Sequence, residues 1–283
     1  MATCIVCNSL DSVPFSKKNG HDIVRCTACG LLFVYPIHAS SSDIYNRDYF
    51  EGASKGFGYV NYDEDKEPMK PVFLKYLNII DAELGGKRGK LLDVGAATGY
   101  FVRLARDAGY DAEGVDISEH AAMLGRAKGL RVHTGTIEDA SGIYDCITML
   151  DLIEHVPDPR AVIKKAASLL RRRGVLIINA PDAGSLLARI LGRYWHLISP
   201  PEHLYYFNRS NMRRLLDEEG FDVARMTTIG KWFTIKYIFK VLGRSTHIGL
   251  FQKISSFFSN KSLTRLSLPV NLRDNMFVVA RRR

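Results

Sequence analysis

Four of the five cysteines stand in two pairs of identical spacing near the start of the sequence. Cys4 and Cys7 form the first pair, Cys26 and Cys29 form the second, and two residues separate the members of each pair. Two such pairs can bring four thiolates to one tetrahedral Zn2+ ion, and four cysteine ligands leave no open position for catalysis. We therefore predict a structural zinc site. Two disulfide bonds are the alternative, which the lack of a secretory signal disfavours.

A second group of chemistry-bearing residues follows a short apolar stretch that ends at Asp93. Gly95, Ala97 and Gly99 come next, in the order Asp-Val-Gly-Ala-Ala-Thr-Gly. The glycines permit a sharp turn and leave room for a ligand against the backbone, and the helix N-terminus expected after them favours a carboxylate or phosphate. No Gly-Lys-Ser/Thr occurs here, so the turn is not a triphosphate-binding loop. Ala97 replaces the central glycine of a dinucleotide-binding loop, which disfavours that ligand.

Another acid stands at the end of the next apolar stretch. Asp116 is placed where a carboxylate can accept hydrogen bonds from both hydroxyls of a ribose. Ile137 and Glu138 follow a third stretch, in position to flank an adenine and to accept from its amino group. The two acids together predict a nucleoside-binding edge. The alternative is that Asp93 and Asp116 only cap helices.

The elements that must position these residues alternate along the chain. Short apolar strands separated by helices of about ten residues predict an α/β protein with a doubly wound, mostly parallel sheet that is covered on both faces. Strands are expected at 90–94, 111–115, 131–134, 144–150, 174–179, 221–228 and 275–280. Helices are expected at 70–84, 98–108, 119–128, 160–170 and 209–219.

Three regions follow from this pattern. Residues 1–37 form a small zinc ribbon or knuckle, and residues 38–69 form a linker. Residues 70–283 form the main domain, with insertions at 182–208 and 230–270. The linker is rich in aromatic residues, which either fold over the ligand as a lid or pack against the zinc module. A helical turn is expected in it at 43–50.

Three segments of the sequence together resemble class I S-adenosylmethionine-dependent methyltransferases: Asp93–Phe101, Gly114–Ser118 and Tyr144–Pro159. The resemblance covers about residues 70–283. It implies a seven-stranded Rossmann-like sheet and S-adenosylmethionine as the cofactor. It further implies that Gly95, Ala97 and Gly99 form the loop under the cofactor and that Asp93 meets the methionine amino group. The remaining cofactor contacts that it implies are Asp116 with the ribose, Ile117, Ile137 and Glu138 with the adenine, and Leu150 near the sulfonium.

The zinc module and the segment Pro200–Phe207 narrow the resemblance to bacterial sugar and polysaccharide methyltransferases with an N-terminal zinc-binding domain. Members that methylate carbon in keto-deoxysugars carry a further C-terminal domain, whereas this sequence ends at the last expected strand. We therefore expect O-methylation of a sugar hydroxyl, in a nucleotide-sugar or lipid-linked glycan of surface-polysaccharide or sugar-metabolite synthesis. The alternatives are C-methylation of a keto-sugar, O-methylation of a small aromatic or quinone-like acceptor, and a zinc-dependent RNA-binding module.

Methylation of a hydroxyl requires that a base take its proton. His203 is the candidate, since an imidazole titrates near working pH. Glu202 would orient that ring or bind a sugar hydroxyl, and His155 is the second candidate. Alternatively, His203 caps a helix or fills an aromatic cluster, and His155 is structural. Trp195 and His196 are candidate stacking faces for a sugar.

The charge is unevenly distributed. The chain has 39 Lys and Arg against 30 Asp and Glu, a net charge of +9, and 11 of the basic residues lie between Lys231 and Arg283 with one acid. Basic amphipathic segments within 231–265 predict contact with an anionic membrane surface, or else an ordinary helical lid. Nucleic acid is disfavoured, because no pattern of aromatic and basic residues for stacking is evident. Without a stretch of 18 apolar residues, the expected location is cytoplasmic, with peripheral contact at the inner membrane face.

Overall fold

The computed structural model describes residues 3–37, 62–234 and 267–283. The helical turn expected at 43–50, the linker aromatics before Tyr62 and most of the basic insertion lie outside these residues. The membrane contact predicted for 231–265 therefore stays a prediction. Among the helices of the described residues, none is long and apolar enough to cross a membrane.

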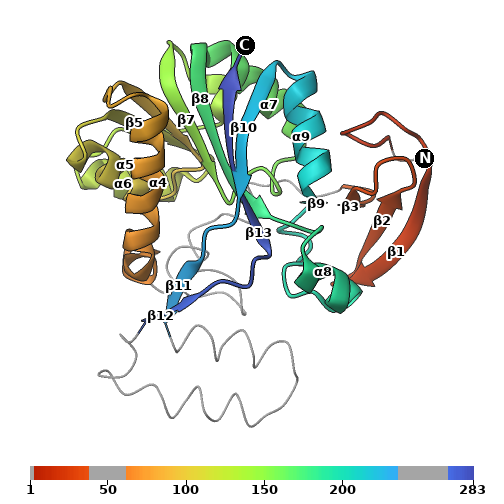
Figure 1. Ribbon diagram of the computed structural model, residues 1–283. Coiled ribbons are helices and arrows are strands. Elements are labelled where there is room, and N and C mark those ends of the chain that lie inside the picture. The colour runs from red at the N-terminus through yellow and green to blue at the C-terminus, as the bar shows by residue number, and fades with distance from the viewer. Residues whose placement is uncertain (1–2, 38–61, 235–266) are drawn as a thin grey trace, which may run out of the picture.

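A seven-stranded sheet forms the centre of the molecule (Figure 1). Its strand order is β10-β13-β8-β7-β4-β5-β6, and the pairs among β8, β7, β4, β5 and β6 are parallel, whereas β13 runs antiparallel to β8 and β10. The doubly wound fold predicted from the sequence is confirmed. The strands are β4 (Lys90–Val94), β5 (Asp111–Asp116), β6 (Val132–Thr134), β7 (Tyr144–Leu150), β8 (Leu170–Pro181), β10 (Phe221–Thr227) and β13 (Asn275–Arg282).

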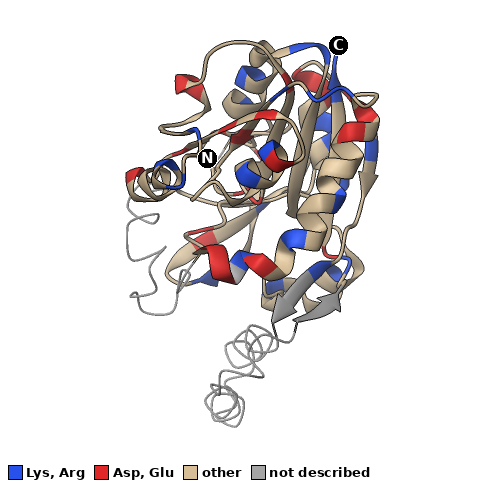
Figure 2. Cartoon of the chain, turned by 90° about the vertical axis from the view of Figure 1, so that its left-hand side faces the viewer, with Lys and Arg blue, Asp and Glu red and all other residues tan. Residues whose placement is uncertain are grey.

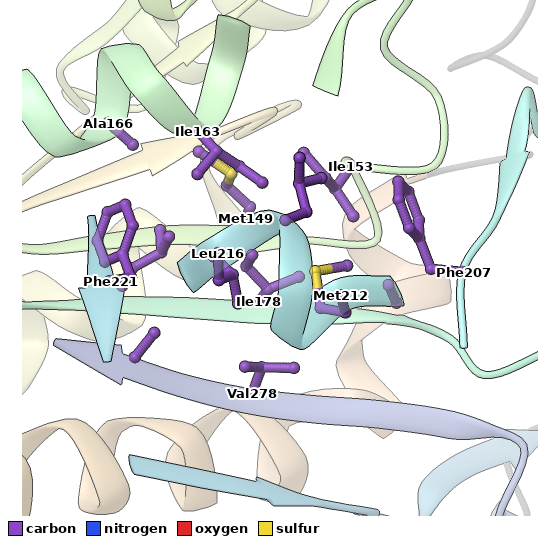
Figure 3. Packing of buried hydrophobic residues seen from close by; sticks show 14 of the residues in the cluster. Met149, Ile153, Ile163, Ala166, Ile178, Phe207, Met212, Leu216, Phe221 and Val278 are labelled. Atoms are coloured by element: carbon purple, nitrogen blue, oxygen red, sulfur yellow. The ribbon is translucent and has the colours of Figure 1, made fainter. Parts of the chain in front are cut away.

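Helices cover both faces of this sheet. α4 (Lys70–Glu83), α5 (Tyr100–Asp107) and α6 (Glu119–Ala127) lie on one side, and α7 (Pro159–Leu169) and α9 (Arg209–Glu218) lie on the other (Figure 1). Their apolar sides close two buried clusters, one per face. Figure 3 shows the second face, where Met149 and Ile178 of the sheet meet Ile163 of α7 and Leu216 of α9. Side-chain caps begin α6, α7 and α9. At α7, the Asp158 carboxylate accepts from the Ala161 N–H at 2.9 Å.

The N-terminal module is not a separate body. Its strands β1 (Ser12–Lys18), β2 (His21–Cys26) and β3 (Leu32–Val34) form a four-stranded sheet with β9 (Tyr205–Tyr206), which belongs to the insertion of the main domain. Leu32 lies opposite Tyr206 and Phe33 opposite Tyr205. Arg160 of α7 adds hydrogen bonds to the carbonyls of Ile5 and Val6 at 3.1 and 3.0 Å. The module therefore supports the segment that carries His203.

Residues 62–69, expected as linker, are helical: α3 (Tyr62–Lys66) is followed by a 3-10 turn, η1 (Glu67–Met69). Hydrogen bonds tie this segment to the glycine-containing turn, from Thr98 to Asp63 and from Tyr100 to Glu67. Tyr62 packs against Ala97. The smaller elements are η2 (Ile137–Asp139), α8 (Leu186–Leu191), η3 (Gly192–Tyr194) and the antiparallel pair β11 (Lys231–Thr234) and β12 (Ser267–Val270).

Part of the basic excess near the C-terminus is neutralised inside the molecule. Lys231 pairs with Asp151, Arg281 with Glu83, and Arg283 with Asp217 and Asp222. Figure 2 shows basic and acidic positions interspersed over the body of the protein. Six of the 11 basic residues between Lys231 and Arg283 lie outside the described residues, so the basic amphipathic segments stay a prediction.

Candidate functional site

The turn after β4 places backbone, not side chains, at the carboxyl edge of the sheet. Gly95, Ala97 and Gly99 all have left-handed backbones, with φ of +77°, +49° and +78°. A Cβ on Gly95 would stand 3.0 Å from Leu152, whereas one on Gly99 would stand 2.9 Å from both Leu130 and Val132. Gly99 is thus required by packing against neighbouring elements. Gly95 brings the turn against the loop that follows β7.

Asp116, at the end of β5, connects the turn after β4 to the turn after β5. One carboxylate oxygen accepts from the Ala97 N–H at 2.7 Å, and the other accepts from the Ser118 N–H at 2.9 Å. Burial raises the pKa of Asp116, and these two N–H groups act against that rise. Each oxygen has a second lone pair, so the carboxylate can still accept two hydroxyl groups.

Asp93 lies one strand away and is 4% exposed. The Thr148 hydroxyl donates to its Oδ1 at 2.6 Å. Burial raises the pKa of Asp93 to about 7, the negative charge of Asp116 adds to the rise, and the Thr148 hydrogen bond opposes it. A cationic group placed against Asp93 would therefore stabilise its ionised form.

This burial predicts a pH dependence of stability. An acid whose pKa is higher in the folded protein stabilises the fold while protonated, and that contribution is lost as the pH rises through about 7. We expect the ligand-free protein to melt at a lower temperature at pH 8 than at pH 5.5. In an Asp93→Asn variant the drop should shrink by about 3 °C or more, measured by scanning calorimetry. An equal drop in both proteins would show that Asp93 is already ionised at pH 5.5.

The predicted adenine contacts have different surroundings. Ile117 is 39% exposed and so offers an apolar surface beyond Asp116. Ile137 is 2% exposed and packs in the same buried cluster as Val115, which gives it a place in the core. Glu138 is exposed, with Lys165 3.8 Å away. Leu150 is half-buried and packs against the cluster under α4 and α5.

A polar network that sequence reasoning missed lies at the ends of β7 and β8. Lys231 Nζ lies 3.0 Å from both carboxylate oxygens of Asp151, and Asn179 donates to the same carboxylate at 2.5 Å. Although burial acts to raise it, the charge of Lys231 lowers the pKa of Asp151 below its ordinary value. Asp151 comes directly after the last residue of β7, and Asp116 is the last residue of β5. A search of the sequence for acids at strand ends, which identified Asp116, would therefore also have identified Asp151. Lys231 is 80 positions away and gave no such signal.

The loop after β7 also carries Glu154 and His155, and the structure brings both to His203. The ring centroids of His155 and His203 are 4.7 Å apart, and His155 Nε2 lies 3.7 Å from Glu154 Oε1. His155 Nδ1 lies 2.8 Å from the Glu202 carbonyl oxygen, and His203 Nδ1 lies 2.7 Å from that of Leu197. Carbonyls only accept, so each Nδ1 carries the proton and each neutral ring has its lone pair on Nε2.

Burial controls the protonation of this cluster. It lowers the pKa of His155 to about 4 and that of His203 to about 3, and it raises the pKa of Glu154 to about 8. The electrostatic effect of His155 and, to a smaller extent, the positive charge of Lys231 also disfavour the imidazolium of His203. Both rings are therefore neutral at physiological pH. His203 can accept a hydrogen bond there, but it is a weak base.

Glu202 and Trp195 were also predicted on the acceptor side. Glu202 meets His155 through its backbone carbonyl, while its carboxylate accepts from the Ser199 hydroxyl at 3.4 Å. Trp195 is 1% exposed, and its indole N–H donates to Asp274. Its predicted role as a stacking face is therefore wrong, because the ring fills the core between the insertion and the N-terminal module.

The four paired cysteines converge. The Sγ atoms of Cys4 and Cys29, and those of Cys7 and Cys26, are 3.5 Å apart, and all four lie within 4.8 Å of one another as free thiols. Asn8 and Gly30, the residues after each pair, both take a left-handed backbone, which closes the two turns in the same way. Although burial acts to raise it, hydrogen bonds from the Cys29 N–H, the Cys7 thiol and the Ala28 N–H lower the pKa of Cys26 to about 7. This donor set fits one tetrahedral Zn2+ ion.

Comparison with known proteins gives a family and relatives. Residues 70–225 match the family described as "Methyltransferase domain". The chain is 28% identical over 159 residues to a ubiquinone biosynthesis O-methyltransferase of Bordetella avium, covering 47% of this chain and 65% of that protein, so less than two thirds of it. It is 26% identical to the protein of that name from Acinetobacter baumannii (strain ACICU), over 56% of this chain and 75% of that one.

Two solved structures share the fold. A magnesium protoporphyrin IX methyltransferase from Synechocystis with bound SAH has a TM-score of 0.52 and 19% identity, over 84% of this chain and 98% of that one. An S-adenosylmethionine-dependent methyltransferase from Archaeoglobus fulgidus has a TM-score of 0.51 and 18% identity, over 78% of this chain and 97% of that one.

Proposed function

The chain belongs to the methyltransferase domain family, and from this premise we propose that it transfers the methyl group of S-adenosylmethionine to a hydroxyl of a quinone-like aromatic ring. The names of the two relatives, both O-methyltransferases of ubiquinone biosynthesis, support this acceptor class. The cofactor supplies a methyl group bound to a sulfonium sulfur. An acceptor oxygen aligned with that carbon takes the methyl group, and the sulfur leaves. The protein's task is to hold both partners and to manage one proton.

The ends of β4 and β5 fit the cofactor. Asp116 is held by two backbone N–H groups and accepts the ribose hydroxyls with its remaining lone pairs. Asp93, buried and short of positive charge, takes the methionine amino group. In the turn beneath the cofactor, Gly95 and Gly99 have no side chain, and Ala97 has only a methyl group. Ile117 and Glu138 serve the adenine, with Ile137 behind them in the core, and Leu150 stands at the end of β7 on the methyl side.

The observation that carries the acceptor class is the weak basicity of His203. Its neutral ring accepts a hydrogen bond from the acceptor hydroxyl, with His155 and the Glu202 carbonyl fixing the cluster around it. A base whose pKa is about 3 removes a proton poorly from a sugar alcohol. A hydroxyl on an aromatic ring is far more acidic, as the tyrosine pKa of about 10 illustrates. The site therefore suits an aromatic hydroxyl better than a sugar.

Zn2+ at the four cysteines has a structural role in this proposal. The closed ligand set supplies folding free energy to a module too small to form a large core. Because β3 pairs with β9, the module in turn fixes the segment that includes His203. The ion contributes to activity through the backbone that it stabilises.

A sugar acceptor is the second candidate, and one observation favours it. The cysteine module and the segment Pro200–Phe207, which carry the resemblance to sugar methyltransferases, are joined through β3 and β9 in one sheet. In this interpretation, a glycan would bind next to the joined segment, with one of its hydroxyls beside His203. Such an acceptor requires more help with its proton than the imidazole alone provides.

An acceptor comparison tests the proposal. Purified protein is incubated with S-adenosylmethionine and either a 1,2-dihydroxybenzene with an alkyl chain or a nucleotide-linked deoxysugar, and products are identified by mass spectrometry. We expect a methyl ether of the ring hydroxyl, and a turnover at least tenfold lower with the sugar. Methylation of the sugar alone would replace the first acceptor class by the second.

A further inference from the structure

Glu154, His155 and His203 form a second group of potential metal ligands. One ligand atom from each lies within 4.8 Å of the other two. We propose that these three side chains bind a divalent transition-metal cation, at a site distinct from the four cysteines. The donor set is two imidazole nitrogens and one carboxylate, which suits Zn2+ and neighbouring first-row ions.

The two histidines are oriented as metal-binding histidines are. Each donates its Nδ1–H to a backbone carbonyl, to that of Glu202 at 2.8 Å and to that of Leu197 at 2.7 Å. Such bonds fix the tautomer and the plane of a ring, and they leave the Nε2 lone pair as the donor to a metal.

The Glu154 carboxylate is also suited to binding a cation. Glu154 is 2% exposed, and its Oε2 has no hydrogen-bond partner among the described residues. A buried carboxyl oxygen without a partner is costly, and a cation in the cluster would remove that cost. Ligand atoms of a tetrahedral Zn2+ ion lie about 3.3 Å apart, given bonds of about 2.0 Å. The 3.7 Å between His155 Nε2 and Glu154 Oε1 requires only a small contraction.

The backbone around the cluster is held firmly. The Glu154 carbonyl accepts from the N–H groups of Leu204 and Tyr205 at 2.8 and 3.2 Å, so the loop after β7 and the segment of His203 are joined directly. Neighbouring side chains anchor both in the core, Ile153 on one segment and Phe207 on the other (Figure 3). Ligand side chains on supported segments are the condition for a preorganised metal site.

The consequence for catalysis rests on the proposed function. Three protein ligands leave at least one coordination position open, unlike the closed cysteine site. A hydroxyl bound there loses its proton more readily, because the cation stabilises the oxygen anion. The O–H bond breaks with the proton passing to water. The oxygen then attacks the methyl carbon, and the C–S bond breaks with its electron pair going to sulfur. When the cation is bound, the metal occupies the Nε2 lone pair of His203, because Nδ1 donates to the Leu197 carbonyl. The cation then replaces the hydrogen bond that the neutral ring offers the hydroxyl in the metal-free site.

Metal binding is measured directly on the full chain. Protein with Zn2+ at the cysteines is titrated with Co2+, and binding is followed by calorimetry and by visible absorption. We expect one additional equivalent with the weak bands of nitrogen and oxygen ligands, without the near-ultraviolet charge-transfer band that thiolates give. Glu154→Gln, which preserves the shape, should raise the Kd for Co2+ by about 100-fold or more. His133→Ala, at an exposed histidine of β6, is the matched control and should bind as the parent does.

Two results would overturn the site: no additional equivalent in the parent protein, or unchanged affinity in Glu154→Gln. The melting temperature and the affinity for S-adenosylhomocysteine of that variant show that it is folded. Failure of the proposed function looks different, because Co2+ would then bind as expected while no aromatic hydroxyl is methylated. Conversely, methylation of that hydroxyl with no additional metal equivalent would contradict the proposed metal site but agree with the proposed function.

Discussion

Cys26→Ser is expected to release the zinc of the cysteine cluster and to unfold the N-terminal module. Structural zinc sites in small domains contribute about 10–16 kcal/mol of apparent binding free energy, which is also folding free energy. Residues 3–37 have little core of their own, so the module cannot keep β3 paired with β9 without the ion. We expect metal analysis to show one zinc fewer per chain and proteolysis to cleave the module. Methyl transfer should fall at least 100-fold.

Affinity for the cofactor separates this effect from general unfolding. The turn after β4 belongs to the seven-stranded sheet and not to the N-terminal module. The Kd for S-adenosylhomocysteine should therefore change by less than about threefold in Cys26→Ser. Cys146→Ala is the control, since Cys146 is a buried thiol of β7 outside the cluster. It should retain the full zinc content. A Cys26→Ser protein with its zinc and its activity intact would contradict a structural zinc site at these cysteines.

Asp116→Ala is expected to weaken binding of S-adenosylmethionine and S-adenosylhomocysteine by about 100-fold or more, measured by calorimetry. The change removes a charged acceptor for two ribose hydroxyls, and hydrogen bonds to charged groups contribute about 1.5–3 kcal/mol each. It also removes the carboxylate that fixes the Ala97 and Ser118 N–H groups, so the cofactor turn is less well ordered. Asp116→Asn should lose less, because an amide oxygen still accepts one of these bonds.

The matched control lies on the same strand. Asp111, at the opposite end of β5, pairs with Arg131 on the surface. Asp111→Ala should leave the affinity for both ligands within about twofold of the parent value. Equal affinity in Asp116→Ala and Asp111→Ala would mean that Asp116 has only a structural role, holding the backbone at Ala97 and Ser118.

Much of the main sheet could be predicted because its signal is local. The apolar strands at 90–94 and 144–150 match β4 and β7, since their buried runs are bounded by turn residues. The strand expected at 174–179 is longer in the structure, where β8 begins at Leu170 as soon as α7 ends. The helix at 62–69 was missed because its stability comes from hydrogen bonds to Thr98 and Tyr100. Such bonds leave no periodic pattern in the sequence.

The site divides in the same way. Asp93 and Asp116 could be placed because acids at the ends of adjacent parallel strands must share one edge. His155 and His203 could be named, but their meeting depends on backbone contacts between Glu154 and the segment 204–205. The depressed pKa of His203, which weakens it as a base, follows from burial that residue type does not reveal. The pairing of β3 with β9 was equally hidden, because it joins strands far apart in the chain.

Methyl transfer from S-adenosylmethionine to a quinone-like acceptor is tested most directly with a labelled methyl group. The purified protein is incubated with labelled S-adenosylmethionine and an extract of its source cells, and the lipid-soluble, nucleotide-sugar, nucleic-acid and protein fractions are separated. We predict label in the lipid-soluble fraction, on an oxygen of an aromatic ring, and its absence with Asp116→Ala. Label in the nucleotide-sugar fraction alone would contradict the aromatic acceptor, and label confined to RNA or protein would contradict both small-molecule acceptors.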